Sequence, residues 1–178
     1  MMVKDPEYWY AIQTYFAQEI KVGQYLDACK LSYFIPMCNS YRVDAAGEEK
    51  LCTHPVVHNL IFLRKTKEQK ELQRLLDDCP YAVKVYAHVD NASKWYEIPD
   101  RDILDLRIIC DQTFVEPEII TQQECDLQVG RMVVVKHGPL RGVRGKLVRK
   151  KKKYYVVKSF VGMGVMVSVS RWCCAPDE

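Results

Sequence analysis

The chain has 178 residues, of which 48% are hydrophobic and 28% charged, enough for one domain or two small ones. No run approaches the roughly 18 apolar residues of a membrane-spanning helix, and residues 1–6 lack the apolar core of a secretory signal. We therefore expect a cytoplasmic protein with no membrane partner. Residues 1–126 carry 14 Lys+Arg and 21 Asp+Glu, a net charge of −7, whereas residues 127–178 carry 12 and 2, a net charge of +10. This reversal predicts two bodies with different partners, the basic one suited to a polyanion or an acidic protein face.

The first third of the chain alternates strand and helix patterns. Aromatic and β-branched residues over 9–15 predict a strand, and apolar residues at helical spacing predict a helix over 16–30. Residues 33–38 return to strand character, with Pro36 indicating an edge or bulge. Residues 41–54 predict a hairpin that turns at 45–48.

The next segments repeat that alternation. The largely apolar run 56–63 predicts a central strand, and leucines spaced three and four apart predict a helix over 72–79. Short strands are expected at 82–86 and 94–98, and Pro99 then suits a helix start whose apolar stripe runs to Cys110.

The resulting order, β-α-β-β-α-β with an added helix, predicts an α+β sandwich over residues 1–110 that resembles the ferredoxin-like pattern. Residues 111–126 are polar and acidic and indicate a linker. Residues 127–178 contain strand patterns almost throughout, with a hairpin tip at 149–153, and predict a small β-domain.

Four turn-forming residues separate two Val-rich runs between Val133 and Val148. They are Gly138, Pro139, Gly142 and Gly145. Glycine supplies positive-φ or close-approach positions and proline fixes φ in a tight connection. The arrangement resembles the KOW motif of small SH3-like β-barrels in transcription and ribosomal proteins; the alternative is an ordinary Gly-Pro hairpin.

The order of motifs along the chain extends the resemblance. Trp9-Tyr10 opens a strand, Glu19 lies early in a helix, and Phe34-Ile35-Pro36 precedes the Leu60–Leu63 strand. This order resembles the N-terminal (NGN-type) domain of NusG-type transcription elongation factors, with the KOW-like barrel following the acidic linker. The segments 34–37 and 55–62 are similar to the UpxY-type paralogues, which are specialised antiterminators of polysaccharide operons.

The resemblance implies a non-catalytic factor that binds the clamp of RNA polymerase, beside non-template DNA or nascent RNA, and suppresses pausing or termination. Matched position by position, the polymerase-binding patch would contain Val57, Leu60 and Phe62, with Tyr10 beside it. An apolar patch at a strand's solvent end is costly unless a partner covers it. The alternative is that Leu60 and Phe62 are ordinary core residues.

Two features of the basic segment indicate contacts. The loop 159–164 carries Phe160, Val161 and Met163 at positions where NusG presents apolar residues to a ribosomal protein or Rho; Phe160 could instead plug the barrel end. The hairpin tip contains Lys150, Lys151, Lys152 and Lys153, which could contact nucleic-acid phosphates or form a solvated, solubilising edge.

Other constellations are set aside. Cys52, His54 and His58 lack further ligands at a telling spacing, so no metal site is expected, and no cofactor is expected either. Eight scattered cysteines without a signal predict reduced thiols, including the adjacent Cys173 and Cys174. No nucleophile–base, paired-carboxylate or phosphate-loop pattern is visible, so an enzyme is not expected. The alternative function is an RNA- or ribosome-binding KOW protein whose N-terminal domain is a scaffold.

Overall fold

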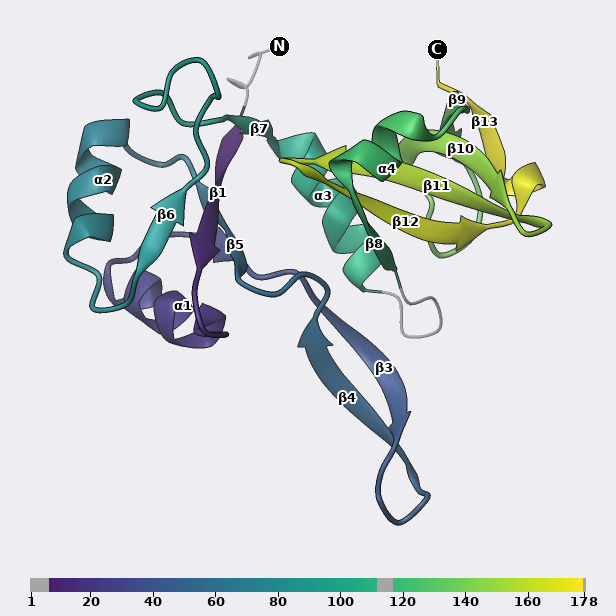
Figure 1. Cartoon of the computed structure of the whole chain (residues 1–178), viewed down its shortest axis with the longest axis horizontal. Helices are drawn as coiled ribbons and strands as arrows, with labels where there is room; N and C mark the ends of the chain where they lie inside the picture. The colour runs from purple at the N-terminus through teal and green to yellow at the C-terminus, as the bar shows by residue number, and fades with distance from the viewer. Residues whose placement is uncertain (1–6, 112–116, 178) are drawn as a thin grey trace, which may run out of the picture. The chain divides into compact units, whose positions relative to one another are not determined.

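The structure, a computed structural model, describes residues 7–111 and 117–177 (Figure 1). It is a mixed α/β protein with several sheets. The chain divides into two compact units. The first comprises Met1–Pro36 and Val57–Ile103, and the second comprises Met37–Val56 and Leu104–Glu178. No helix in the described ranges is long and apolar enough to cross a membrane.

The first unit is built on one antiparallel sheet. Its main strands follow the order β2-β5-β1-β6, and β7 also pairs with β1. The strands are β1 (Tyr8–Thr14), β2 (Tyr33–Phe34), β5 (Leu60–Arg64), β6 (Val83–Val85) and β7 (Ile98–Pro99). Helix α1 (Glu19–Ala28) follows β1 and α2 (Gln69–Asp77) follows β5. The predicted strand–helix alternation is therefore present in this unit, although the strand expected at 94–98 is reduced to the two residues of β7.

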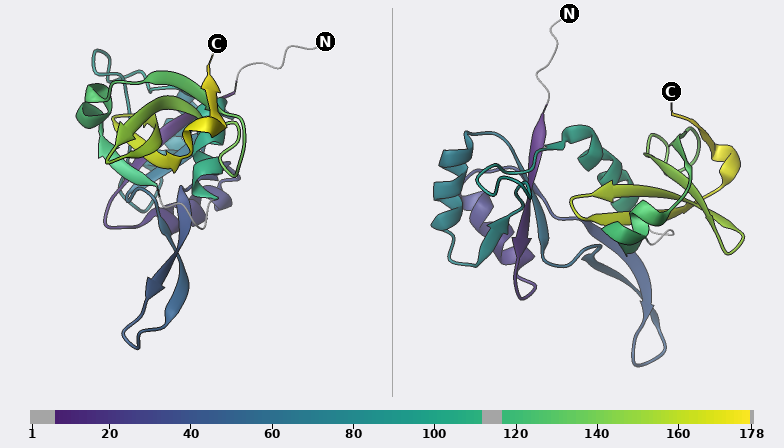
Figure 2. Two further views of the ribbon diagram at one scale, coloured as in Figure 1. Left: turned by 90° about the vertical axis from the view of Figure 1, so that its right-hand side faces the viewer. Right: turned by 45° about the horizontal axis from the view of Figure 1, so that its top comes forward.

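Both helices cover the same face of that sheet (Figures 1 and 2). Side chains from α1, including Val22 and Leu26, and from α2, including Leu72 and Leu76, form one buried cluster with the strands. The strand residues in the cluster are Tyr10, Ile12, Ile61 and Leu63. Their spacing of two positions reflects the alternation of side chains along a strand, which directs every second residue of β1 and β5 to the helices.

Two elements of this unit start later than their sequence patterns predict. Helix α1 begins at Glu19 rather than near residue 16, because Phe16 and Ala17 have φ of 57° and 53° and so leave the right-handed helical region. Strand β5 begins at Leu60 rather than 56, because Asn59 has φ of 60°. Both boundaries are set by left-handed backbone that apolar periodicity does not reveal.

The second unit contains the predicted hairpin. Strands β3 (Met37–Val43) and β4 (Glu49–Pro55) pair antiparallel and form a twisted ribbon (Figure 2). The Asp44 carboxylate accepts hydrogen bonds from the backbone N–H groups of Ala46 (2.8 Å) and Glu48 (3.1 Å), and Gly47 has φ of 83°. These contacts fix the turn where the sequence predicts it. The pKa of Asp44 is lowered, chiefly by a hydrogen bond from Lys50 and then by the two backbone N–H groups.

The C-terminal sheet of the second unit has the strand order β13-β9-β10-β11-β12-β8. Its strands are β8 (Glu118–Thr121), β9 (Arg131–Val135), β10 (Arg144–Lys150), β11 (Lys153–Phe160), β12 (Met163–Val169) and β13 (Cys174–Pro176). Consecutive residues such as Val156 and Val157 are both buried, so both faces of β11 are covered. Helix α4 (Gln122–Leu127) contributes Cys125 to a cluster on one face with Val157 and Met166.

Within this unit the part of helix α3 (Asp100–Cys110) that begins at Leu104 meets β11. The Asp105 carboxylate forms an ion pair with Lys158, and their side chains are only 5% and 12% exposed. Each charge helps to compensate the cost of burying the other.

The expected linker is corrected in part. Residues 118–127 form β8 and α4 instead of an irregular connection. A capping box begins α4: the Thr121 side chain accepts from the Glu124 N–H, and Glu124 accepts from the Thr121 N–H. Residues 112–116 of the predicted linker lie outside the described residues.

The four turn formers serve different purposes. Gly138 and Gly142 have φ of 86° and 97°, which favours glycine. Gly145 instead allows close approach, since a Cβ there would lie 2.5 Å from the Val157 carbonyl oxygen. The Gly142 N–H donates to the Val135 carbonyl (2.8 Å) and so closes the turn.

Candidate partner-binding surfaces

The predicted patch on β5 is largely internal in this structure. Leu60 and Phe62 are 3% and 1% exposed, and the four residues Leu60–Leu63 are all buried. Because side chains alternate along a strand, four consecutive buried residues mean that β5 is covered on both faces. Phe62 also stacks on Phe34 with ring centroids 6.2 Å apart. Leu60 and Phe62 are thus buried in this structure, and their contact with polymerase stays a prediction.

Tyr10 does not lie beside Leu60 and Phe62. It pairs with Leu63 in the β1–β5 register and points to the helix-covered face, where its ring meets Trp95 edge-on at 5.0 Å. Its hydroxyl donates to Glu97 (3.4 Å), and burial is the main cause of its raised pKa. Leu60 and Phe62 pair with Gln13 and Ala11, on the opposite face. Only Val57 of the predicted set is half-buried rather than buried.

An exposed apolar feature that the sequence did not indicate lies in the loop between β1 and α1. Phe16 is 87% exposed, and Ile20 on the first turn of α1 is 55% exposed. The loop is held by Asn59, whose side-chain oxygen accepts from the Ala17 N–H (2.9 Å) and whose carbonyl accepts from the Thr14 N–H (3.0 Å). The buried Glu19 carboxylate accepts from the Asn59 N–H. Phe16 is thus displayed by an ordered, strained turn.

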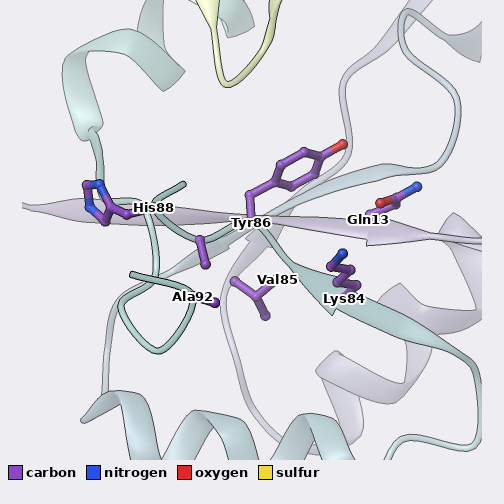
Figure 3. A pocket seen from close by; sticks show the side chains of 7 residues that line it. Gln13, Lys84, Val85, Tyr86, His88 and Ala92 are labelled. Carbon is purple, nitrogen blue, oxygen red and sulfur yellow. The ribbon is translucent and has the colours of Figure 1, made fainter. Parts of the chain in front are cut away.

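A pocket of 310 Å³ lies against β1 and β6 in the first unit (Figure 3). Lys84, Tyr86 and His88 alternate along one face of the β6 segment, and Gln13 pairs with Lys84 from β1. The remaining lining residues are Val85, Ala87 and Ala92. Burial, with a smaller contribution from Tyr15, raises the pKa of Tyr86. The alternating Lys-x-Tyr-x-His pattern is the sequence signal that could have located this site.

The loop between β11 and β12 is a two-residue turn at Val161-Gly162, with Gly162 at φ of 79°. Phe160 is 5% exposed and pairs with Met163, which agrees with the alternative that it plugs the end of the barrel, while its contact with a partner stays a prediction. Val161 and Met163 are half-buried. The apolar surface that this turn offers is therefore smaller than its sequence predicts.

The lysine tip is a two-residue turn at Lys151-Lys152, flanked by the paired Lys150 and Lys153. Lys151 and Lys152 have φ of 48° and 66°, a conformation for which Asn-Gly is the preferred sequence. Lys150 forms an ion pair: its ammonium lies 2.9 Å from the Glu118 carboxylate, and the hydrogen bond between them is the main cause of the raised pKa of Lys150. The tip therefore presents Lys151, Lys152 and Lys153, all exposed.

The turn formers also border a hollow. Gly138 and Pro139 line a pocket of 180 Å³ together with Leu140, Val169 and Cys173. Its walls are mostly apolar.

Metal chemistry finds no support among the described residues, where no group of three or more His, Cys, Asp or Glu side chains could hold an ion. The three residues Cys52, His54 and His58 do not form such a group either. The His54 ring instead lies 3.4 Å from the Cys38 sulfur and 3.5 Å from the Ser40 hydroxyl.

A family model described as "Transcription termination factor nusG" matches residues 7–107, more than half of the chain. No curated protein matches the chain.

Proposed function

The chain belongs to the NusG family of transcription termination and elongation factors, and from that membership we propose that it binds the RNA polymerase clamp through its first unit and suppresses pausing or termination. The family match carries the proposal. A factor that contacts both sides of the polymerase cleft would disfavour the opened, paused state, and such coupling requires only a difference in affinity between the two polymerase states. We propose a cytoplasmic, non-enzymatic protein.

We propose further that the antiparallel sheet with two helices on one face is a ferredoxin-like NGN-type domain over residues 1–110. The C-terminal sheet, with its Gly138–Gly145 turn, would be a KOW-type SH3-like barrel over 127–178. Val161 and Met163 would then contact a ribosomal protein or Rho, and Val57 would lie at the polymerase contact. The likeness of residues 55–62 to UpxY-type paralogues supports specificity for polysaccharide operons.

Phe16 is the exposed side chain that best fits a polymerase contact. It is 87% exposed on a turn in which three residues have left-handed backbone. Aromatic side chains, phenylalanine included, are enriched in protein interfaces. Strained backbone is maintained only where the surroundings over-determine it, and it concentrates at functional sites.

The test is retention of polymerase by the tagged full-length chain. Phe16→Ser should weaken binding about tenfold or more, the loss typical of an aromatic hot spot, whereas Val89→Ser, at a fully exposed apolar residue of the same unit, should leave binding unchanged. Pause lifetimes on a defined template should lengthen with Phe16→Ser. Equal binding by both variants would move the contact elsewhere; no binding by the unmodified chain would reject the proposal.

The alternative, an RNA- or ribosome-binding protein with a scaffold first unit, is favoured by the net charge of +10 over residues 127–178. Recovery of ribosomal RNA without polymerase subunits in the same experiment would select it. Occupancy across the genome separates operon specificity, which predicts enrichment at one operon, from a general role.

A further inference from the structure

We propose that one end of the C-terminal sheet binds single-stranded nucleic acid, with a base stacked on Trp172 and backbone phosphates beside Arg149 and Arg171. The site lies entirely in the second unit, so it does not depend on the polymerase contact. It is built from the β10–β11 hairpin and the 3-10 turn η1 (Arg171–Cys173), which lie at the same end of the sheet (Figure 1).

The first group of the proposed site is Trp172. It is 87% exposed, whereas Trp9 and Trp95 are 4% and 5% exposed. The turn that carries it is hydrogen-bonded on both sides: Cys173 N–H donates to the Ser170 carbonyl (3.0 Å), and the Cys173 carbonyl accepts from the Lys136 N–H (2.7 Å). The indole is therefore held in solvent by ordered backbone, where its face is open to stacking on a base.

The second group is Tyr154 with the two arginines that contact its ring. The guanidinium carbons of Arg149 and Arg171 lie 5.7 and 5.8 Å from the centre of its ring. Strand register explains the arrangement, because Tyr154 pairs with Arg149 on one side and with Val169, two residues before Arg171, on the other. Contact with an aromatic ring restrains both guanidiniums, so two planar phosphate-binding groups are held at the Tyr154 ring, and one of them belongs to the residue directly before Trp172.

The third group is the lysine tip. It begins one residue beyond the Arg149–Tyr154 pair and places Lys151 and Lys152 at positive φ. Side chains other than Gly, Asn or Asp are disfavoured in that conformation. Lysine therefore occupies strained backbone at this turn. Together with Lys153, the two strained lysines add up to three exposed ammonium groups to the positive charge at the same end of the sheet.

Single-stranded nucleic acid fits these groups better than other polyanions do. An aromatic side chain beside restrained guanidiniums and a line of ammonium groups matches a ligand that alternates flat bases with phosphates, and stacking on exposed aromatics is the usual mode of sequence-tolerant single-strand binding. A duplex hides its base faces and would use the charges alone. An anionic membrane surface would use Trp172 as an apolar anchor, for which any large apolar residue serves.

The test uses the full-length chain with a mixed-sequence 12-nucleotide RNA, the same sequence as DNA, the corresponding duplex, and vesicles containing phosphatidylserine. Trp172→Ala should weaken binding to the single strand by about fivefold or more, the loss of one stacked base. Trp172→Phe should bind nearly as well as the unmodified chain, and Trp172→Leu should resemble Trp172→Ala. Since Trp9 and Trp95 are buried, RNA should protect most of the acrylamide-quenchable tryptophan fluorescence.

Charge is tested separately. Arg149→Gln/Arg171→Gln should reduce the slope of log affinity against log salt by about 0.7 for each phosphate that the variant no longer neutralises, whereas Arg131→Gln, an exposed arginine of β9, should not change it. The RNA and DNA strands together show whether the sugar matters.

Several results would overturn the inference: undiminished binding by folded Trp172→Ala, equal binding by the Leu and Phe variants, tighter binding to the duplex, or binding to vesicles alone. Failure of polymerase binding would leave these results unaffected, so the two proposals can fail independently.

Discussion

Asn59 determines the backbone around the most exposed aromatic residue of the first unit. Its own φ of 60° is tolerable because asparagine is among the few residues that visit the left-handed region readily. Its side-chain oxygen and carbonyl then hold the Ala17 and Thr14 N–H groups, while its N–H binds buried Glu19. One residue therefore supports three strained or buried groups.

This arrangement gives a prediction about stability. Asn59→Ala should lower the free energy of unfolding by about 2 kcal/mol, because it combines the strain of a left-handed alanine with the loss of a hydrogen bond to a backbone N–H. Asn59→Gly should cost about 1 kcal/mol, since glycine removes only the hydrogen bond. Urea denaturation followed by tryptophan fluorescence measures both. Equal losses in the two variants would show that strain at residue 59 is not part of the cost.

Helix α4 shows how an element can form from a sequence with little apolar content. The capping box satisfies two N–H groups at its first turn, and Cys125 is its single buried residue. The pKa of Glu124 is lowered, chiefly because the Thr121 backbone N–H and then its hydroxyl donate to the carboxylate. The ionised form is therefore the one that the folded state favours.

The sign of the pH dependence follows. Because the folded pKa lies below the ordinary value of 4.5, the capping contribution is fully present at neutral pH and is lost as the pH falls from 4.5 through the folded pKa. Glu124→Gln should therefore be less stable than the unmodified chain at pH 7 and approach it in acid. Glu49→Gln, at an exposed residue of β4, is the control. Thermal unfolding between pH 3 and pH 7 measures the difference, and a constant difference would exclude the ionised cap.

Elements with a strong local signal could be predicted from the sequence. The leucine spacing of α2, the Asp44–Glu48 turn and the glycines of the Gly138–Gly145 turn each depend on residues close in the chain. Both turns appear where expected, and α2 begins and ends a few residues before the expected range 72–79. Strand β8 and helix α4 could not be predicted, because a polar sequence acquires its structure there from pairing with β12 and from one cap.

The binding surfaces were less predictable for a related reason. Whether Leu60 is exposed depends on what covers the second face of β5, and whether Tyr10 lies beside Phe62 depends on the parity of the β1–β5 register. The Tyr154 site joins residues from three segments, Arg149, Tyr154 and Arg171. A single sequence shows residue types and local period but not these pairings.

The cysteines connect the packing of the whole chain to one measurement. All eight are free thiols. Cys38, Cys110 and Cys125 are buried and all belong to the second unit, whereas Cys29, Cys52, Cys79, Cys173 and Cys174 are half-buried. Burial is the main cause that raises the pKa of Cys110 to about 12 and that raises the pKa of Cys174, whose neighbour Cys173 adds to the effect.

Alkylation should therefore distinguish the two classes. The thiolate is the reactive form, so at pH 8 iodoacetamide should modify the half-buried cysteines slowly, Cys173 before Cys174, and should leave the three buried ones unmodified until denaturant unfolds the second unit. Peptide mapping by mass spectrometry identifies each site. The melting temperature should be the same with and without a reductant, because no cross-link contributes to stability. Modification of Cys110 at the rate of Cys173 in the native chain would contradict the packing of α3 in the second unit, and a reductant-sensitive melting temperature would contradict the reduced state of the thiols.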